Sequence, residues 1–381
     1  MAQSQTPGTA PVEGRWTAAA AKDWYADQDW LVGANYVPSS ASNQIEMWQE
    51  DTFNIQEIDK ELGWAKSLGM NTMRVFLHDL VWDQDPEGYK ARIEQFLTVA
   101  DKHGIKPMFV LFDSVWDPEP HTGPQREPAA GVHNAGWVQG PGAAALQDET
   151  QRPRLQAYVE GVVGAFARDP RVLAWDVWNE PDNTNASSYG AKEPPNKVDL
   201  VAPLLEDTFR WARSANPTQP LTSGVWIGEW DKDEKLDNNV QRVQLKNSDI
   251  ITFHNYAPAE DFARKAKYLA DNDRPLICTE YMARPTGSTF EAIMPVAKEN
   301  NIGLFNWGFV QGRAQTHIPW DSWQKPYTED PKPWFHEVLR QDGSPYIEKE
   351  VEFIKSMTAK KPQAAPLVRP DAKPSRPSFG A

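Results

Sequence analysis

The chain has 381 residues with 39 Lys and Arg against 53 Asp and Glu, so its formal net charge at neutral pH is −14. This acidic balance argues against a nucleic-acid-binding protein, because neutralising phosphates requires clustered basic residues. No stretch approaches the roughly 18 apolar residues of a membrane span. A single cysteine, Cys278, excludes both an intramolecular disulfide and a cysteine-based zinc site.

The two ends of the chain differ from the rest in composition. Residues 1–15 are polar and contain Pro and Gly, without the apolar and charged regions of a signal peptide. Residues 359–381 are rich in Pro and basic residues, which predicts a flexible tail. We predict one folded domain over residues 16–358. Ala2 would be the first residue of a mature secreted or periplasmic protein whose signal peptide has been removed.

Short apolar runs alternate with helical patterns inside the predicted domain. Eight runs are typical of buried strands: Trp30–Tyr36, Thr72–Leu77, Lys106–Phe112, Leu173–Trp178, Pro220–Trp226, Asp249–His254, Pro275–Thr279 and Ile302–Trp307.

Helical periodicity separates these runs. The pattern from Ile55 to Leu68 repeats at three and four positions before Gly69 ends it. A second helix presents one apolar face: Leu155, Tyr158, Val159, Val162, Val163 and Phe166. Strands that alternate with helices imply parallel pairing through right-handed crossovers. We therefore predict an α/β protein of a single (β/α)8 TIM-barrel domain, in preference to a doubly wound open sheet.

Long connections follow the third and eighth predicted strands, at Asp113–Gln147 and Phe309–Pro333. In a TIM barrel the loops at the carboxyl ends of the strands carry the chemistry. Loops of this length are usually either functional or disordered, and the tryptophans in both favour function. The chain has 17 tryptophans, more than a core needs, which indicates either dense packing or a groove lined with flat apolar rings.

Two glutamates follow apolar strands that end on nearly opposite sides of the predicted barrel. Glu180 follows the fourth strand and Glu280 ends the seventh. Cleavage of a glycosidic bond needs such a pair, one carboxylic acid to protonate the leaving oxygen and one carboxylate at the oxocarbenium-like centre. The alternative interpretation is that both are solvated residues at strand ends.

The order of motifs at the strand ends resembles glycoside hydrolase clan A, and most closely glycoside hydrolase family 5, the cellulase-like family. The resemblance covers roughly residues 30–340 and rests on these positions: Trp178-Asn179-Glu180-Pro181, His254-Asn255-Tyr256, Glu280 and Trp307. It implies that Glu180 is the general acid/base and Glu280 the nucleophile of a retaining double displacement.

The resemblance also implies roles in substrate binding. Asn179 would hydrogen-bond the sugar 2-hydroxyl, and Trp307 would form the floor of the −1 subsite. Tyr256 would lie beside the nucleophile, and His254 would orient the acid/base unless it is a structural histidine. Arg74 on the second strand would pair with the nucleophile, the alternative being a salt bridge without a catalytic part.

Electrostatics agrees with this division of roles. Arg74 and Tyr256 near Glu280 favour its ionised form, whereas Glu180, facing an anion in a partly dry cavity, is expected to stay protonated. Both Asn179 and Glu180 can serve one site only if the chain bends at the strand end, because adjacent strand residues point to opposite faces.

The chain departs from the family pattern at one place. Phe112-Asp113-Ser114 ends the third strand, where many family members carry a histidine.

The first predicted loop adds candidates for substrate binding. It places Asn35, Glu46 and Trp48 near the expected mouth, although Glu46 is equally well explained as a carboxylate at a helix start. Several tryptophans are candidate platforms on which an indole covers the apolar face of a pyranose, about half of them being expected in the core: Trp116, Trp137, Trp226, Trp230, Trp320 and Trp323.

Metal and cofactor chemistry has little support in the sequence. The histidines show neither a His-x-x-x-His pair nor a Cys partner. A short acidic turn at Asp231, Asp233 and Glu234 lacks the glycine of a calcium loop. We predict no metal, no cofactor and no phosphate-binding glycine loop.

The sequence therefore predicts a retaining β-glycosidase that acts on a neutral β-linked glycan of the glucan, xylan or mannan type. Its partner would be an oligo- or polysaccharide, and the number of subunits is left open. One alternative is an exo-acting glycosidase or transglycosylase with the same machinery. Another is a non-catalytic glycan-binding barrel.

Overall fold

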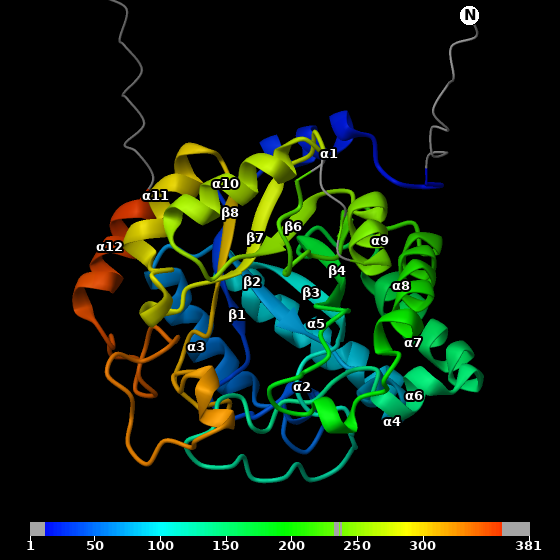
Figure 1. The fold of residues 1–381 in the computed structure, drawn as a ribbon, viewed down its shortest axis with the longest axis horizontal. Helices are drawn as coiled ribbons and strands as arrows, with labels where there is room; N and C mark the ends of the chain where they lie inside the picture. Colours follow the sequence, from blue (N-terminus) through cyan, green and yellow to red (C-terminus); the bar gives the residue numbers. More distant parts are fainter. Residues whose placement is uncertain (1–11, 232–235, 237, 360–381) are drawn as a thin grey trace, which may run out of the picture.

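The computed structural model describes residues 12–231, 236 and 238–359. Eight parallel strands form its centre (Figure 1). They are β1 (Val32–Tyr36), β2 (Thr72–Phe76), β3 (Lys106–Asp113), β4 (Ala174–Asn179), β5 (Leu221–Thr222), β6 (Ile251–His254), β7 (Leu276–Tyr281) and β8 (Gly303–Trp307).

The sheet curls into a barrel. Sequential neighbours pair from β1 to β5 and from β6 to β8, and β1 also pairs with β8, with Gly33 opposite Phe305. Between β5 and β6 the sheet closes through a single parallel bridge from Val225 to Phe253. This arrangement confirms the predicted (β/α)8 barrel and excludes the open doubly wound sheet.

Helices surround the barrel. The α-helices are α1 (Ala18–Ala26), α2 (Gln44–Trp48), α3 (Ile55–Ser67), α4 (Asp79–Gln84), α5 (Pro86–Lys102), α6 (Ala143–Gln147), α7 (Arg152–Phe166), α8 (Lys197–Ser214), α9 (Asn239–Asn247), α10 (Ala259–Ala270), α11 (Phe290–Glu299) and α12 (Glu348–Thr358). Short 3-10 helices are η1 (Glu149–Gln151), η2 (Gly190–Lys192), η3 (Arg284–Thr286) and η4 (Trp320–Trp323).

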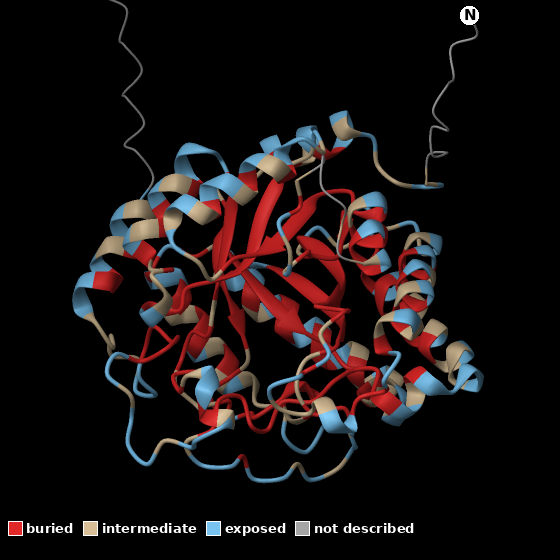
Figure 2. Cartoon of the chain, in the orientation of Figure 1, coloured by how far each residue is buried: buried red, intermediate tan, exposed pale blue. Residues whose placement is uncertain are grey.

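Apolar periodicity explains how the helices pack. The buried face of α7 consists of the six residues predicted from their spacing, Leu155 to Phe166. Helix α3 begins after Asn54, whose side chain accepts a hydrogen bond from the backbone of Glu57, a normal N-cap. Gly69 follows α3 with φ +76°, a conformation that glycine adopts without strain. Figure 2 shows the result, with buried strands inside and helices exposed only on their outer faces.

Every predicted strand run contains a strand, but β5 is much shorter than the predicted Pro220–Trp226. Side chains satisfy the backbone there in place of a strand partner, because Ser223 N donates to Ser248 Oγ at 3.1 Å. The chain then leaves the barrel wall, which moves Trp226 into the loop above β5.

The described residues contain no helix that is long and apolar enough to cross a membrane. Most of the two predicted terminal segments, and Asp233 and Glu234 of the predicted acidic turn, lie outside the described residues.

Candidate active site

Glu180 and Glu280 lie together at the carboxyl end of the barrel, where the sequence predicts them. One carboxylate oxygen of each lies within 4.8 Å of the other and of a ring nitrogen of His254. The exposed fractions of the two glutamates are only 8% and 5%. Both line a pocket of about 490 Å³, which is within the usual size range of small-ligand sites.

The backbone turns sharply where β4 ends. Glu180 follows the last strand residue, Asn179, and adopts φ +42°, which is uncommon for a residue other than glycine. Asn179 and Glu180 consequently both line the pocket although they are adjacent in sequence. The pairing of β7 with β8 also shifts register between Cys278 and Tyr281, beside Glu280. These irregularities supply the bend that the predicted site requires.

Glu280 is surrounded by hydrogen-bond donors. Its Oε1 accepts from Arg74 Nη1 at 3.0 Å, and its Oε2 accepts from the Tyr256 hydroxyl at 2.8 Å. Burial raises the pKa of Glu280, and the positive charge of Arg74 and the Tyr256 hydroxyl oppose that rise. These donors favour the ionised carboxylate.

Arg74 is fully buried and is held by other residues as well. Its Nε and Nη2 both donate to Asp176 Oδ2, at 3.0 and 2.8 Å. It also donates to the side-chain oxygens of Asn35 and Asn179, at 2.8 and 2.7 Å. The guanidinium therefore has a fixed orientation toward Glu280.

Glu180 contacts no basic side chain other than His254. Its Oε1 lies 2.9 Å from His254 Nδ1, and its Oε2 accepts from Asn183 Nδ2 at 2.7 Å. Burial raises the pKa of Glu180 to about 7, with the Asn183 amide opposing the rise and the Asp182 carboxylate adding to it. Burial also lowers the pKa of His254 to about 4, so this imidazole is neutral near pH 7. Burial raises the pKa of both glutamates, and the two differ in their hydrogen-bond donors, which are Arg74 and Tyr256 for Glu280 and the neutral Asn183 amide for Glu180.

Aromatic side chains form a large part of the pocket wall. Trp307 lies at the end of β8 and packs edge-on against Phe76 and Trp137, with ring centroids 5.8 and 6.1 Å away. Five tryptophans line the pocket: Trp116, Trp137, Trp226, Trp307 and Trp320.

Two of the predicted platforms lie elsewhere. Trp230 is 5% exposed and packs on Phe253 in the core. Trp323 is outside the pocket and stacks behind Trp116, with ring centroids 5.3 Å apart and planes 13° apart.

Three residues that were predicted near the mouth from the first βα connection do not line the pocket. Trp48 is completely buried and its indole N–H donates to Phe76 O, so the prediction that it contacts substrate is wrong. Glu46 lies in the first turn of α2 and accepts from the backbone of Ser42 at 2.6 Å, which supports its interpretation as a helix-start carboxylate. Asn35 lies behind Arg74 and orients it. Asn35 lies in β1 and not in the loop, and spacing could not show on which side of α2 Glu46 and Trp48 point.

Glu180, His254 and Glu280 are close enough to ligate one cation. However, hydrogen bonds already engage both oxygens of each carboxylate, and the Arg74 guanidinium lies 3.0 Å from Glu280. This donor set suits a pair of reacting carboxylates better than a metal ion.

A family model described as Cellulase (glycosyl hydrolase family 5) matches residues 41–312. The chain belongs to this family. This family 5 protein is accordingly a glycoside hydrolase, as the strand-end motifs predict. No curated protein sequence matches the chain.

Solved structures with similar folds agree with a family 5 barrel. An exo-β-1,4-mannosidase from Opitutaceae bacterium strain TAV5 has 19% identity and a TM-score of 0.57 over 92% of this chain, which spans 62% of that enzyme. A GH5_18 structure from Streptomyces cattleya with Manb1-4GlcNAc has 14% identity and a TM-score of 0.60, covering 90% of this chain and 83% of the other. The endo-β-1,4-mannanase from Thermotoga petrophila has 14% identity and a TM-score of 0.55, covering 88% and 77%.

Asp113 is a pocket residue of this family 5 enzyme that the sequence did not predict to have a function. It ends β3, at the departure from the family pattern, and lines the pocket. Its carboxylate accepts from Asn179 Nδ2 at 3.0 Å and from Trp137 Nε1 at 2.6 Å. Burial raises the pKa of Asp113 to about 7, with hydrogen bonds from Trp137 and Asn179 opposing the rise. The sequence offered only one indication of a role for Asp113, which is its position as an acidic residue at a strand end. No motif surrounds it.

We expect Asp113→Asn to lower kcat/KM by about tenfold to hundredfold, because a mispaired buried polar group costs about 1–3 kcal/mol. Asn179 and Trp137 donate to different oxygens of Asp113, and the asparagine keeps only one oxygen, so one of the two donors would face an NH2 group and shift within the pocket. Steady-state kinetics and melting temperatures should be measured beside Asp117→Asn, which removes a buried carboxylate from the same loop outside the pocket and should leave kcat/KM within about twofold. An unchanged kcat/KM in Asp113→Asn would show that Asp113 positions neither neighbour.

Proposed function

We propose that this family 5 enzyme hydrolyses neutral β-linked glycans with retention of anomeric configuration, using Glu280 as nucleophile and Glu180 as general acid/base. The observation that carries the proposal is the pair of buried carboxylates with opposite surroundings. Burial raises the pKa of both groups, but Glu280 accepts from the Arg74 guanidinium and the Tyr256 hydroxyl, whereas Glu180 accepts from the neutral Asn183 amide. One group is suited to attack and the other to donate a proton.

In the first step Glu280 attacks the anomeric carbon. A bond forms between that carbon and a Glu280 carboxylate oxygen while the bond to the leaving oxygen breaks. The proton of Glu180 passes to the leaving oxygen, which departs as an alcohol. The products are a glycosyl ester on Glu280 and an ionised Glu180.

In the second step water takes the place of the leaving alcohol. Glu180 accepts a proton from water while the oxygen of water bonds to the anomeric carbon and the ester bond to Glu280 breaks. Glu180 can act as a base at this stage because the negative charge of Glu280 is neutralised in the ester. Two inversions at one carbon give overall retention.

The short separation of the carboxylates supports retention over inversion. Their nearest ligand oxygens lie within 4.8 Å, whereas inverting enzymes keep the carboxyl groups about 6.5–9.5 Å apart so that water fits between them. His254 Nδ1 lies 2.9 Å from Glu180 and 3.4 Å from Glu280, and in the proposed mechanism it orients the acid/base.

Sugar binding would use Asn179 and Trp307. One N–H of the Asn179 amide donates to Asp113 and its oxygen accepts from Arg74, which leaves its second N–H for the sugar 2-hydroxyl. The Trp307 indole would cover the apolar face of the ring in the −1 subsite. The similar solved structures include a mannosidase and a mannanase, so β-mannosides are the first substrate class to test.

The proposal is tested by a hydrolysis screen over mannan, β-glucan, xylan and aryl β-glycosides, with NMR of the first anomer released. We expect the β-anomer to appear first and the α-anomer only later by mutarotation. An α-anomer as first product would overturn Glu280 as nucleophile. Binding without turnover over the whole panel would instead favour the non-catalytic glycan-binding barrel.

A further inference from the structure

Two long loops meet over one side of the barrel mouth. The β3 loop (residues 114–142) and the β8 loop (residues 308–347) run along the lower edge of the view in Figure 1. Tyr327 N donates to Gly131 O at 2.9 Å, and Gly131 N donates to Gln315 Oε1 at 3.0 Å. His133 lies deeper, 2.7 Å from Ile318 O through Nδ1. The two loops are therefore joined by backbone as well as side-chain hydrogen bonds.

The β1 loop (residues 37–43) fills the remaining gap between them. Arg313 N in the β8 loop donates to Ser39 O at 3.0 Å, and Asn43 Nδ2 donates to Gly136 O in the β3 loop at 2.9 Å. Gly312 lies so close to the first loop that a Cβ there would stand 2.5 Å from Ser39 Cα. The three loops form a continuous cover over the ends of β1 and β2.

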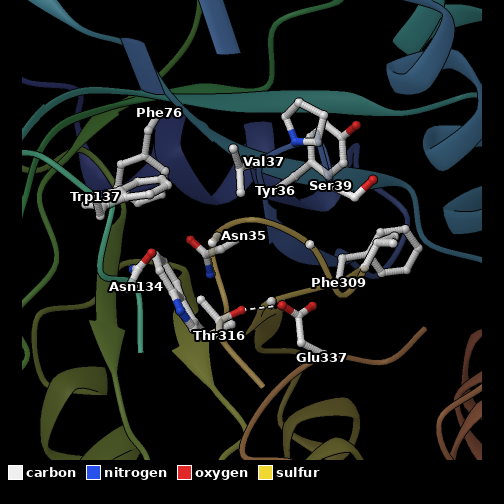
Figure 3. Close-up of a pocket in the computed structure, with 16 residues that line it drawn as sticks. Asn35, Tyr36, Val37, Ser39, Phe76, Asn134, Trp137, Phe309, Thr316 and Glu337 are labelled. Carbon is white, nitrogen blue, oxygen red and sulfur yellow. Dashed lines mark hydrogen bonds between the residues drawn. The ribbon is translucent and has the colours of Figure 1, made fainter. Parts of the chain in front are cut away.

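Only a small cavity is left beneath this cover (Figure 3). Its volume of about 20 Å³ holds about one water molecule and no sugar ring. Asn134 and Glu337 line it, and the Asn134 amide and Glu337 Oε2 have no hydrogen-bond partner among the described residues. The cavity is therefore polar enough to hold water but too small to be a sugar subsite.

Trp137 and Trp307 form the wall between this cavity and the reaction pocket, because both residues line both spaces. Trp137 is the one that belongs to the covering β3 loop. It is only 3% exposed, packs on Phe76 with ring centroids 5.2 Å apart, and donates to Asp113. Figure 3 shows Trp137 and Phe76 side by side at one end of the cavity. A tryptophan held both by packing and by a buried hydrogen bond is fixed in place.

The opposite side of the pocket is open. It is lined by the loop after β4 and by Trp226 and Ile227 after β5. Trp320 of the β8 loop reaches this side, where it packs on Tyr256. Ile227 and Trp320 are 45% and 37% exposed, and no other large apolar side chain among the described residues is so exposed. Exposed apolar groups at the rim of a pocket mark a binding surface.

The positions of the two glutamates give the cleft a direction. Glu180 protonates the leaving oxygen in the proposed mechanism, so the leaving group lies beside Glu180 and the open side. The ring attacked by Glu280 extends the other way, over Trp307 toward Trp137. Its non-reducing end therefore faces the closed side of the pocket.

We propose that the enzyme removes single sugar residues from the non-reducing end of β-linked oligosaccharides and cannot cleave internal bonds. This inference rests on the proposed function, because the roles of Glu180 and Glu280 define the direction. The reducing side of the substrate can have any length, since it leaves the pocket over Ile227 and Trp320.

Blocked substrates test the inference on the native enzyme. The probes are 4-nitrophenyl β-tetraosides of 1,4-linked mannose, glucose and xylose, each compared with its analogue methylated at O4 of the non-reducing terminal sugar. We expect the uncapped compound to lose one terminal monosaccharide at a time, and the capped compound to react at least about 100-fold more slowly, as measured by mass spectrometry of all products. Internal fragments from both compounds would overturn exo action while leaving the proposed function intact. No hydrolysis of any tetraoside or aryl monoside would overturn the proposed function itself.

A pair of tryptophan variants tests the wall directly. Trp137→Ala joins the cavity to the pocket, so we expect the ratio of capped to uncapped rates to rise at least about tenfold. Trp226→Ala removes a tryptophan from the open side and should leave this ratio unchanged. Because the readout is a ratio within one enzyme, partial loss of folded protein does not affect it. An unchanged ratio in Trp137→Ala would contradict the assignment of Trp137 as the barrier.

Discussion

Replacing Glu280 with alanine is expected to lower kcat/KM by at least about 10⁴-fold, because in the proposed mechanism Glu280 forms the glycosyl ester. The space left by the side chain admits a small anion beside Arg74 and Tyr256, the donors that hold the native carboxylate. Sodium azide should therefore restore turnover of an activated aryl β-glycoside and give an α-glycosyl azide, since a single inversion takes place.

NMR of the azide product and the rate against azide concentration are the measurements. The matched control is Glu291→Ala, at an exposed position on α11, which should keep kcat/KM within about twofold. Full hydrolytic activity in Glu280→Ala, or a β-glycosyl azide, would contradict its role as nucleophile.

Replacing Glu180 with alanine is expected to have an effect that depends on the leaving group. For unactivated oligosaccharides kcat/KM should fall by about 10²–10⁴-fold, the contribution of a positioned general acid. Dinitrophenyl glycosides need no proton in the first step, so they should form the glycosyl ester rapidly and then accumulate it. Azide should attack this ester and give a β-glycosyl azide, because two inversions have then occurred.

The pH dependence of the native enzyme provides a second test of Glu180. In the proposed mechanism Glu180 is protonated in the free enzyme, and burial raises its pKa to about 7. The value of kcat/KM should therefore fall tenfold per pH unit above about pH 7 as the proton is lost. This alkaline limb should be absent in Glu180→Ala assayed on a dinitrophenyl glycoside. An identical limb in the variant would assign the titration to another group, of which Asp113 is the nearest candidate.

The order of elements and the position of the reacting carboxylates could be predicted from the sequence. Buried parallel strands read as continuous apolar runs, and each run contains a strand in the structure. In a TIM barrel the functional residues lie at the carboxyl ends of the strands. This is why Glu180 and Glu280, which are 100 residues apart in the sequence, were expected to lie together. Arg74 and Tyr256 were also found, because the family pattern assigns them to particular strand ends and the structure places both within 3.0 Å of Glu280.

What could not be predicted depends on side-chain direction and on contacts between distant loops. The spacing of Trp48 puts it in the first loop, but helix α2 turns its indole into the core against Phe53. Asp113 has no motif around it, and its importance appears only when Trp137 and Asn179 are seen to share its carboxylate. The cover over β1 and β2 likewise needs partners such as Gly131 and Tyr327, which lie almost 200 residues apart.

The two carboxylates that share Arg74 are not equivalent during the proposed cycle. Glu280 gives up its negative charge when the ester forms, whereas Asp176 keeps two N–H groups of the guanidinium on one oxygen throughout. Arg74 therefore does not have to reorient between the two chemical steps, and the donor that will stabilise the departing carboxylate is already in place when water attacks. Asp176 does not line the pocket, so in the proposed cycle it holds Arg74 in one orientation through both chemical steps.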